Sequence, residues 1–338
     1  MNRDAQRTLF HPFETGDIAS PAVGRSMLYL GAEPGFQLPE EFASRLSLVQ
    51  GFRPYFNALK AAGHQVSPQA DDGPFDGALV LAGRHRGQNE ARIAAAIELV
   101  VAGGTIVVAG SADTGIASLR KRLEKLVALD GYLPKYHGAA MWFSRPADAA
   151  AAIAGLKPQQ GLADGRFVAA PGMFSHDRID AGSRLLAEHL PDAAKGAAAD
   201  FGAGWGYLSV ALAERTQGLK SIDLYEADFE SLEAAKTNLA TVAGAPAAEF
   251  FWHDLVGENV DRKYDLIVMN PPFHQGRAAE PGIGQAFIGT ASASLRPGGR
   301  LFMVQNRGLP YEQILSARFS RVQEIGRDGA FRIVVAQR

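Results

Sequence analysis

Strand and helix signals alternate along the second half of this 338-residue chain, and that alternation constrains the fold more than any other feature. Short apolar runs predict strands at residues 196–200, 221–225, 249–252, 264–269 and 300–304. Residues 207–215 and 229–239 have the apolar spacing of helices, and Pro297-Gly298-Gly299 is expected to end the helix before the last strand. Alternation of this kind predicts a parallel sheet with crossover helices.

The first half repeats the same pattern. Its predicted strands are residues 27–30, 77–82 and 105–109, and its predicted helix is residues 91–101. Two local matches indicate duplication. Phe75-Asp76 before an apolar run is similar to Tyr264-Asp265 before another, and Gly103-Gly104 is similar to Gly298-Gly299. The predicted fold class is therefore α/β, with two tandem Rossmann-like domains whose sheets are mainly parallel.

The first copy lacks the residues that could carry chemistry in the second. Leu81-Ala82-Gly83 stands where the second copy has Asn270-Pro271-Pro272, and the segment from Leu30 to Gly35 has neither an acid at the strand end nor the full glycine spacing. Turn-forming residues between the copies predict a linker. The predicted organisation is a degenerate domain at residues 1–150, a linker at 151–172 and a catalytic domain at 173–338.

Composition places the chain in the soluble globular class, with 47% hydrophobic and 21% charged residues. No apolar run approaches the roughly 18 residues of a membrane helix, and the start Met1-Asn2-Arg3-Asp4 lacks the order of a signal peptide, so we expect a cytoplasmic protein. The absence of cysteine excludes disulfides, thiolate zinc sites and cysteine nucleophiles. The eight histidines are scattered without ligand spacing, so no metal site is predicted.

A glycine-rich loop, Asp200-Phe201-Gly202-Ala203-Gly204-Trp205-Gly206, joins a predicted strand to a predicted helix. Glycines in such a loop let the backbone turn sharply and approach a ligand closely. Dinucleotide enzymes usually place the third glycine one residue further on, and an acid at the strand end would repel their pyrophosphate. Asp200 suits the ammonium group of an amino acid, which favours S-adenosylmethionine over a nicotinamide or flavin cofactor.

Acids at the ends of the next two strands extend this interpretation. Glu226 can accept hydrogen bonds from both ribose hydroxyls, and Asp254 is placed to accept one from the adenine amino group. A glycine loop alone can be a packing device, but two acids at successive strand ends favour a cofactor site. The residues predicted to hold the cofactor are Asp200, Phe201, Gly202, Ala203, Gly204, Gly206, Glu226, Ala227, Asp254, Leu255 and Asn270.

The segment Asn270-Pro271-Pro272-Phe273 follows a buried strand at the sheet edge where α/β proteins usually bind ligands. Proline disfavours helix in the preceding residue, so Asn270 is expected to be extended. Its amide oxygen and the Pro271 carbonyl could each accept one hydrogen of a planar amino group and aim the nitrogen lone pair at a methyl sulfonium. Phe273 offers a flat face on which a base could stack. The alternative is a plain turn with one exposed aromatic residue.

Together these residues resemble the small-subunit ribosomal RNA guanine-N2 methyltransferases, with the large-subunit guanine-N2 enzymes close behind. The resemblance is firm from about Pro171 onward, where Pro171-Gly172-Met173-Phe174-Ser175, with Asp180 and Gly182-Ser183 after it, is similar to the family's segment beside the cofactor. It implies that Phe174 and Ser175 line the cofactor pocket and that the first half is a degenerate methyltransferase domain that helps to hold RNA. Trp205 departs from the family, because it is large for a glycine loop.

The resulting hypothesis is methyl transfer from S-adenosylmethionine to the exocyclic N2 amine of a guanine in ribosomal RNA. Asn270, Pro271, Pro272 and Phe273 are the predicted catalytic residues, with ribosomal RNA or a ribosomal subunit as partner. Methylation of a glutamine side chain or of adenine N6 is the alternative with the same chemistry, since those enzymes share the Asn-Pro-Pro segment. An inactive RNA-binding or ribosome-assembly protein is the alternative of another class.

Two basic clusters in the first half, Arg84-His85-Arg86 and Arg120-Lys121-Arg122, could bind a phosphate backbone. Ordinary solvated faces explain them more simply. With a formal net charge of −2, any nucleic-acid partner must be held by a local patch and not by bulk charge.

Overall fold

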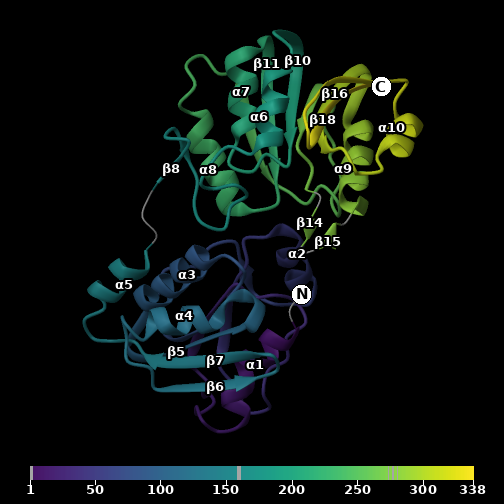
Figure 1. The fold of residues 1–338 in the computed structure, drawn as a ribbon. Helices are drawn as coiled ribbons and strands as arrows, with labels where there is room; N and C mark the ends of the chain where they lie inside the picture. The colour runs from purple at the N-terminus through teal and green to yellow at the C-terminus, as the bar shows by residue number, and fades with distance from the viewer. Residues whose placement is uncertain (1–2, 158–160, 273, 276–277, 280) are drawn as a thin grey trace. The chain divides into compact units, whose positions relative to one another are not determined.

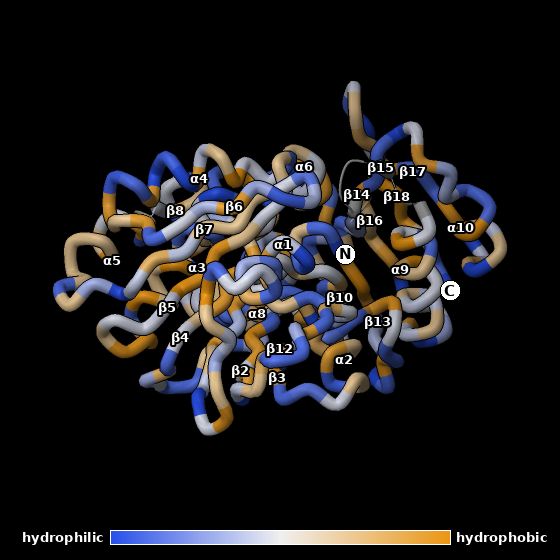
Figure 2. Tube along the Cα trace, turned by 90° about the horizontal axis from the view of Figure 1, so that it is seen from below, coloured by the Kyte–Doolittle hydropathy of each residue, from blue (hydrophilic) through white to orange (hydrophobic). Residues whose placement is uncertain are grey.

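The computed structural model describes residues 3–157, 161–272, 274–275, 278–279 and 281–338. The chain divides into two compact units, Met1–Gln160 and Gly161–Arg338, and each contains one seven-stranded sheet (Figure 1). Apolar strand segments alternate with polar loops along the trace (Figure 2). Within the described residues, no helix is both long and apolar enough to cross a membrane.

The second unit is a mainly parallel sheet in the order β12-β11-β10-β13-β16-β18-β17, with β18 antiparallel to both of its neighbours. Its strands are β10 (Ala193–Phe201), β11 (Gln217–Glu226), β12 (Ala247–Trp252), β13 (Tyr264–Met269), β16 (Leu295–Asn306), β17 (Arg321–Arg327) and β18 (Phe331–Gln337). A short hairpin of β14 (His274–Gln275) and β15 (Ala278–Ala279) follows β13. Each of the five predicted strands of this half is confirmed.

Helices cover both faces of this sheet. They are α6 (Ala181–Glu188), α7 (Tyr207–Arg215), α8 (Phe229–Leu239), α9 (Pro281–Ser294) and α10 (Glu312–Arg318). Leu186, Leu208 and Leu232, from α6, α7 and α8, belong to one buried cluster, whereas α9 and α10 contribute to another. The two clusters use alternate residues of the strands, as period-two side chains on a sheet require.

The first unit has the same topology, in the order β3-β2-β1-β4-β5-β7-β6, again with an antiparallel β7. Its strands are β1 (Ser26–Leu30), β2 (Arg45–Val49), β3 (Val66–Ser67), β4 (Phe75–Leu81), β5 (Val100–Ser111), β6 (Gly131–Lys135) and β7 (Gly138–Ser144). Its helices are α1 (Arg3–Glu14), α2 (Arg53–Ala61), α3 (Arg86–Leu99), α4 (Ile116–Leu123) and α5 (Ala150–Leu156). Identical strand order confirms the predicted duplication.

The two sequence matches that indicated duplication correspond to shared contacts. Asp76, at the start of β4, accepts a hydrogen bond from the Ser26 backbone N–H at 2.8 Å. Asp265, at the start of β13, accepts one from the Ala197 N–H at 2.9 Å. In each unit this carboxylate therefore ties the beginning of the fourth strand to the first. Gly103 and Gly298 likewise have φ values of 77° and 79°.

The predicted linker at residues 151–172 is mostly folded. The boundary between the units, after Gln160, lies inside this range, but α5 packs within the first unit with Leu156 fully buried. In the second unit β8 (Leu162–Ala163) pairs with β9 (Phe167–Val168), and Ala163 and Phe167 enter the core. Gly165, one of the turn-forming residues that predicted the linker, forms the turn of this hairpin, whereas Gly161, Pro171 and Gly172 lie outside it.

Two predicted helix ends also need correction. The helix predicted at 91–101 ends at Leu99, because Val100 already pairs with Phe75 in the sheet. Residues 295–299 belong to β16 and not to the end of the preceding helix, because Leu295 pairs with Tyr264. The positive φ of Gly298 accompanies the register shift between these two strands.

Candidate active site

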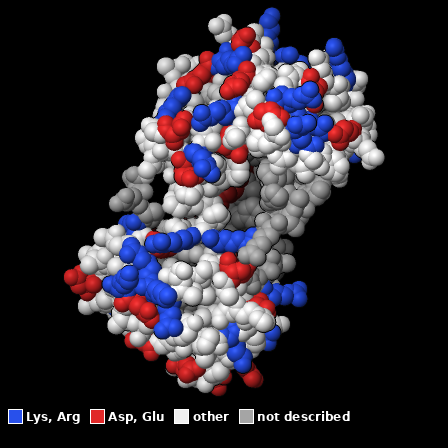
Figure 3. Space-filling view, in the orientation of Figure 1, with Lys and Arg blue, Asp and Glu red and all other residues white. Residues whose placement is uncertain are grey.

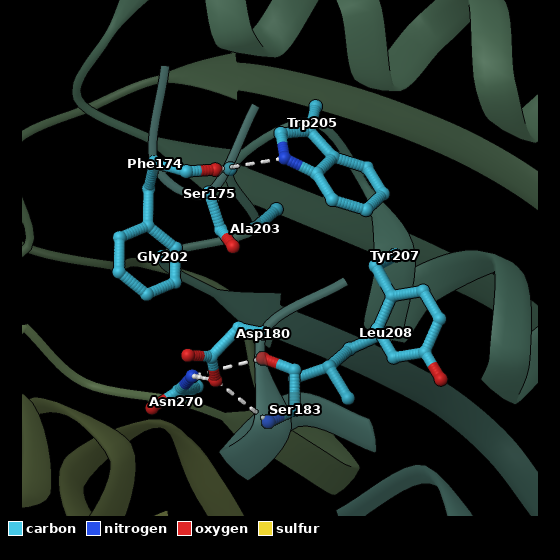
Figure 4. Close-up of a pocket in the computed structure, with 11 residues that line it drawn as sticks. Phe174, Ser175, Asp180, Ser183, Gly202, Ala203, Trp205, Tyr207, Leu208 and Asn270 are labelled. Atoms are coloured by element: carbon cyan, nitrogen blue, oxygen red, sulfur yellow. Dashed lines mark hydrogen bonds between the residues drawn. The ribbon is translucent and has the colours of Figure 1, made fainter. Parts of the chain in front are cut away.

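A pocket lies beside the carboxyl ends of β10 and β13, where the glycine loop meets the segment before α6 (Figure 4). Its empty volume is about 400 Å³, part of which is open solvent. The lining residues are Phe174, Ser175, Asp180, Ser183, Gly202, Ala203, Gly204, Trp205, Tyr207, Leu208 and Asn270. Much of the predicted cofactor loop and Asn270 of the predicted clamp therefore share one cavity.

The glycine loop turns through three residues with left-handed backbone. The φ values of Gly202, Gly204 and Gly206 are 75°, 54° and 89°, a region that favours glycine. The N–H groups of Gly202 and Ala203 both donate to the Tyr225 carbonyl at the end of β11, at 2.9 and 3.0 Å. The sheet therefore fixes the start of the loop, while the space beside the Cα of Gly204 is open.

Gly206 allows α8 to approach the loop, which gives a testable prediction. A Cβ there would lie 3.0 Å from the Ala235 Cα in addition to adopting an unfavourable φ. We expect Gly206→Ala to lower the free energy of unfolding by about 1–3 kcal/mol more than Gly244→Ala. Gly244 is the matched control, since its φ of 70° is similar but nothing lies within 4 Å. Chemical denaturation of both variants measures the difference, and equal losses would contradict the close approach.

Asp200 is fully buried at the end of β10, beneath the loop. One oxygen, Oδ2, accepts a hydrogen bond from the Ser209 hydroxyl at 2.7 Å, whereas Oδ1 has no partner among the described residues. Burial raises the pKa of Asp200 to about 7; the hydrogen bond from Ser209 opposes this shift and the charge of Glu226 adds to it. A buried carboxylate oxygen without a donor is costly. Asp200 is not among the residues that line the pocket, so its predicted contact with the cofactor ammonium group remains a prediction.

Glu226 ends β11 next to the same loop. Its Oε2 accepts from the Gly204 N–H at 2.7 Å, and its Oε1 accepts from the Asp228 N–H at 2.8 Å. Burial raises the pKa of this carboxyl to about 7, although both backbone hydrogen bonds lower it. Ala227, the next residue, accepts from the Trp252 indole at 2.9 Å. Glu226 is therefore held against the loop, but it is not among the residues that line the pocket, and its contact with the ribose remains a prediction.

Asp254 lies two residues beyond β12 and is not among the residues that line the pocket. Its Oδ1 accepts from the Val256 N–H at 2.9 Å, and this contact closes the turn. Leu255 is buried in the core, and its carbonyl accepts from the Thr290 hydroxyl. The predicted adenine contact of Asp254 remains a prediction.

Asn270 follows β13 and is held by two side chains at the start of α6. Its Nδ2 donates to the Asp180 Oδ2 at 2.9 Å and to the Ser183 hydroxyl oxygen at 2.8 Å. No donor among the described residues meets the amide carbonyl oxygen, which is what the clamp hypothesis requires. Pro271 is buried and Pro272 is exposed, whereas Phe273 lies outside the described residues.

Phe174 and Ser175 line the pocket, as the family resemblance implied. The Phe174 side chain is 59% exposed, and its carbonyl accepts from the Trp205 indole N–H at 2.8 Å. The Trp205 ring packs against Phe167 with 5.2 Å between ring centroids. The large residue in the glycine loop is thus explained, because it ties the segment around Phe174 to the loop.

The family resemblance placed Asp180 and Ser183 in the segment beside the cofactor, and both line the pocket, but their contact with Asn270 was not predicted. Asp180 precedes α6 and accepts from the Ser183 N–H at 2.9 Å, which is an ordinary helix N-cap. A cap can be recognised from an aspartate before an apolar helical run. Its additional contact with Asn270, 90 residues further along the chain, has no local signal in the sequence.

The first unit keeps the loop geometry but not the acids. The N–H groups of Gly31 and Ala32 both donate to the Val49 carbonyl, as the corresponding groups of the second unit do to Tyr225. Gln50 follows Val49 at the position of Glu226, and its Oε1 accepts from the Phe52 N–H at 2.8 Å. Tyr29 stands at the position of Asp200, two residues before the first loop glycine.

Arg92 of α3 fills the space beside this first loop. A Cβ on Gly31 would lie 2.6 Å from the Arg92 Nη1, and that nitrogen donates to the Leu81 carbonyl at 3.2 Å. At the matching position of the second unit, a Cβ on Gly202 would lie 3.2 Å from the Phe287 ring of α9. The first unit therefore has a guanidinium where the second has an aromatic ring, and a tyrosine where the second has the Asp200 carboxylate. Among the described residues of the whole chain, no group of three or more His, Asp or Glu side chains could hold a metal ion.

Comparisons with known proteins agree with this geometry. A family model described as "Methyltransferase small domain" matches residues 164–335. The "Ribosomal RNA small subunit methyltransferase C" of Aeromonas hydrophila is 29% identical over 269 residues, which are 78% of this chain and 77% of that protein. The Klebsiella pneumoniae protein of the same name is 36% identical over 163 residues, 48% of this chain and 46% of that protein.

One solved structure matches nearly the whole chain. It is the Thermus thermophilus "16S rRNA N2 G1207 methyltransferase (RsmC) in complex with AdoMet and Guanosine", with a TM-score of 0.78 and 25% sequence identity. The match covers 98% of this chain and 91% of that one. The two-unit fold, and not only the second unit, is therefore shared with a solved structure.

Proposed function

Because the chain belongs to the methyltransferase small-domain family, we propose that it transfers a methyl group from S-adenosylmethionine to the exocyclic N2 amine of a guanine in ribosomal RNA. The observation that carries the proposal is the Asn270 amide, whose nitrogen is engaged by Asp180 and Ser183 while its oxygen remains for an amine hydrogen. The names of the relatives from Aeromonas and Thermus support the choice of ribosomal RNA, and the second names a guanine N2 position.

Residues of the second unit fit S-adenosylmethionine, which supplies an electrophilic methyl group on sulfur when bound. The unpartnered Oδ1 of Asp200 suits the ammonium group. Glu226, held by two backbone N–H groups, suits the ribose hydroxyls. Open space beside Gly204 allows a ligand to approach the backbone, and Asp254 would accept from the adenine amino group.

Asn270 and Pro271 would orient the substrate amine. The Asn270 Oδ1 and the Pro271 carbonyl each accept one amine hydrogen, which localises the nitrogen lone pair. No strong base is needed at the nitrogen, because it becomes acidic as it acquires the methyl group. Phe273 would stack on a base turned out of its helix.

The first unit would help to hold RNA. It repeats the fold without the acids, so the same scaffold is available for another task. On the face of this unit that carries α3 and α4, Lys and Arg side chains gather (Figure 3). Arg120, Lys121 and Arg122 lie on α4, although Arg120 also pairs with Glu124. A ribosomal substrate would place the enzyme in the cytoplasm.

Methyl transfer to defined substrates tests the proposed function. Purified protein with tritiated S-adenosylmethionine is incubated separately with small ribosomal subunits, large subunits, extracted RNA, a release factor and DNA. We expect label in N2-methylguanosine of ribosomal RNA, and at lower substrate concentration than for a short guanine-containing oligonucleotide. Label in methylglutamine or N6-methyladenine would establish one of the alternatives, and no binding of S-adenosylmethionine would indicate an inactive scaffold.

The raised pKa values of Asp200 and Glu226, both about 7, predict pH-dependent cofactor binding. Each carboxyl must be ionised to accept hydrogen bonds from a cationic or hydroxylic ligand, so affinity is lost as the pH falls through 7. A carboxyl with a pKa of about 7 is about tenfold less ionised at pH 6 than at pH 8. The dissociation constant of S-adenosylmethionine should therefore rise about tenfold per carboxylate when the pH is lowered from 8 to 6. Isothermal titration calorimetry at several pH values measures this, and a constant value would contradict it.

The stability of the ligand-free protein should change in the opposite direction. A carboxyl whose pKa is raised by folding contributes stability below its unfolded value of about 4, and this contribution is lost as the pH rises through about 7. S-adenosylmethionine should therefore raise the melting midpoint more at pH 8 than at pH 6. Glu226→Gln provides the control, because it removes one of the two titrating groups.

A further inference from the structure

The Asn270 amide is fixed by acceptors that belong to the start of α6. Its Nδ2 donates to Asp180 and Ser183, and Figure 4 shows the three side chains converging at one side of the pocket. Ser183 is only 8% exposed. Gly182 keeps the space clear, since a Cβ there would lie 3.1 Å from the Asp180 Oδ2. The contact is thus built into the fold and is not a chance meeting of surface side chains.

The chemistry of the two acceptors selects one orientation of the amide. An asparagine amide turned by 180° exchanges its oxygen and nitrogen with almost no change of shape. The Ser183 hydroxyl could tolerate either orientation, because it can donate or accept. An ionised Asp180 can only accept, so the turned amide would place two oxygens together. Asp180 therefore determines that the Asn270 oxygen faces away from α6.

We propose that Asp180 is a positioning residue for methyl transfer, which with Ser183 holds the Asn270 oxygen toward the substrate amine. The proposal rests on the proposed function, in which that oxygen accepts an amine hydrogen. A hydrogen bond to a carboxylate also polarises the amide and makes its oxygen a stronger acceptor. Asp180 thus acts through Asn270 and does not itself contact the reacting atoms.

Asp180→Ser separates this role from the helix cap. Serine is as good an N-cap as aspartate, but its shorter side chain removes the carboxylate that Asn270 contacts. We expect the turnover number to fall about 10- to 100-fold, the range typical of lost positioning, while the dissociation constant of S-adenosylmethionine changes less than about threefold. In Asp180→Asn the Ser183 N–H would still require an oxygen at this position, so the amide oxygen of the new asparagine can meet both donors and the variant should recover most of the turnover.

A matched substitution at another helix start controls for folding. Asp228 caps α8 by accepting from the Ser231 N–H at 2.9 Å, the same distance as at α6. Asp228→Ser and Asp180→Ser should therefore shift the melting midpoint of the ligand-free protein equally, by about 2 °C or less. Asp228→Ser serves only for this thermal comparison, because Asp228 adjoins Glu226.

The effect of Asp180→Ser should vanish when Asn270 is already alanine, since residues that act as a unit are not additive. If Asp180→Ser lowers the turnover number as much in the Asn270→Ala background as in the unmodified protein, Asp180 does not act through Asn270, and the proposal is overturned. Loss of S-adenosylmethionine affinity in parallel with turnover would make Asp180 a cofactor ligand, which also overturns it.

Nuclear magnetic resonance tests the orientation without any RNA. In ¹⁵N-labelled protein, the Asn270 side-chain amide signals are identified by their loss in Asn270→Ala. We expect these signals to shift and to exchange faster with water in Asp180→Ser, and to be nearly restored in Asp180→Asn. Unchanged signals would refute the orientation. If the signals change but no ribosomal RNA is methylated by the wild-type protein, the proposed function fails while the contact stands.

Discussion

Asn270→Ala is expected to lower the turnover number for methyl transfer by about a thousandfold, the upper part of the range for removing one preorganised polar contact. The Asn270 oxygen is the acceptor that the hydrogen bonds to Asp180 and Ser183 leave available. Without it, the amine nitrogen loses the contact that localises its lone pair. Asn270 lines the pocket beside the glycine loop, but its nitrogen is held by Asp180 and Ser183 and its oxygen is assigned to the substrate amine, so the dissociation constant of S-adenosylmethionine should stay within about threefold.

The measurement is single-turnover methyl transfer with saturating S-adenosylmethionine, combined with calorimetric titration of the cofactor. Asn259→Ala is the matched control, since Asn259 is exposed and lies outside the pocket lining. Its turnover should equal that of the unmodified protein. Equal losses of turnover and cofactor affinity in Asn270→Ala would argue against the clamp.

Glu226→Gln should weaken S-adenosylmethionine binding by about 10- to 100-fold, because hydrogen bonds to a charged group contribute about 1.5–3 kcal/mol. The substitution removes the charge and one acceptor but keeps the shape. Gln50 occupies the equivalent position of the first unit, where its Oε1 accepts from the Phe52 N–H and its Nε2 donates to the Ala32 carbonyl at 2.6 Å. In Glu226→Gln the amide nitrogen would instead meet the Gly204 N–H, which donates to Glu226 Oε2, so the loop must shift and the melting midpoint of the variant is measured as a check on folding.

Calorimetric titration at pH 8 measures the loss, because Glu226 is ionised there. Glu214→Gln is the control for the same change at an exposed site, where the carboxylate pairs only with Arg166 among the described residues. The affinity of Glu214→Gln for S-adenosylmethionine should match that of the unmodified protein. Unchanged affinity in Glu226→Gln would remove Glu226 from the cofactor site and leave its hydrogen bonds to the loop as a structural device.

Local signals explain which elements could be predicted. The helices at 207–215 and 229–239 were predicted from their apolar spacing with the bounds that the structure has, and in the structure Gly206 and Asp228 stand directly before them. The strand at 264–269 was also right, since its apolar run is bounded by charge and by proline. Periodicity and caps depend on neighbouring residues, so a single sequence contains them.

Contacts between distant segments could not be predicted in this way. The indole of Trp205 reaches the Phe174 carbonyl 31 residues away, and neither residue indicates the other. The hairpin of β8 and β9 was predicted as part of a linker because its strands are only two residues long and glycines and prolines flank it, and the burial of Ala163 and Phe167 shows that it belongs to the core. Composition limits the local conformations that a segment can adopt, whereas packing against the rest of the protein selects one of them.

The shared anchoring of the two glycine loops separates architecture from ligand binding. In both units the first two loop residues donate to the carbonyl at the end of the second strand. The loop backbone is thus anchored to the neighbouring strand, and this anchoring is kept in the first unit, which lacks the two acids. A cofactor site of this kind can be lost through substitutions such as tyrosine for Asp200 and glutamine for Glu226, with the scaffold intact. In a duplicated chain, one domain can therefore acquire a different binding role while the other keeps the catalytic residues.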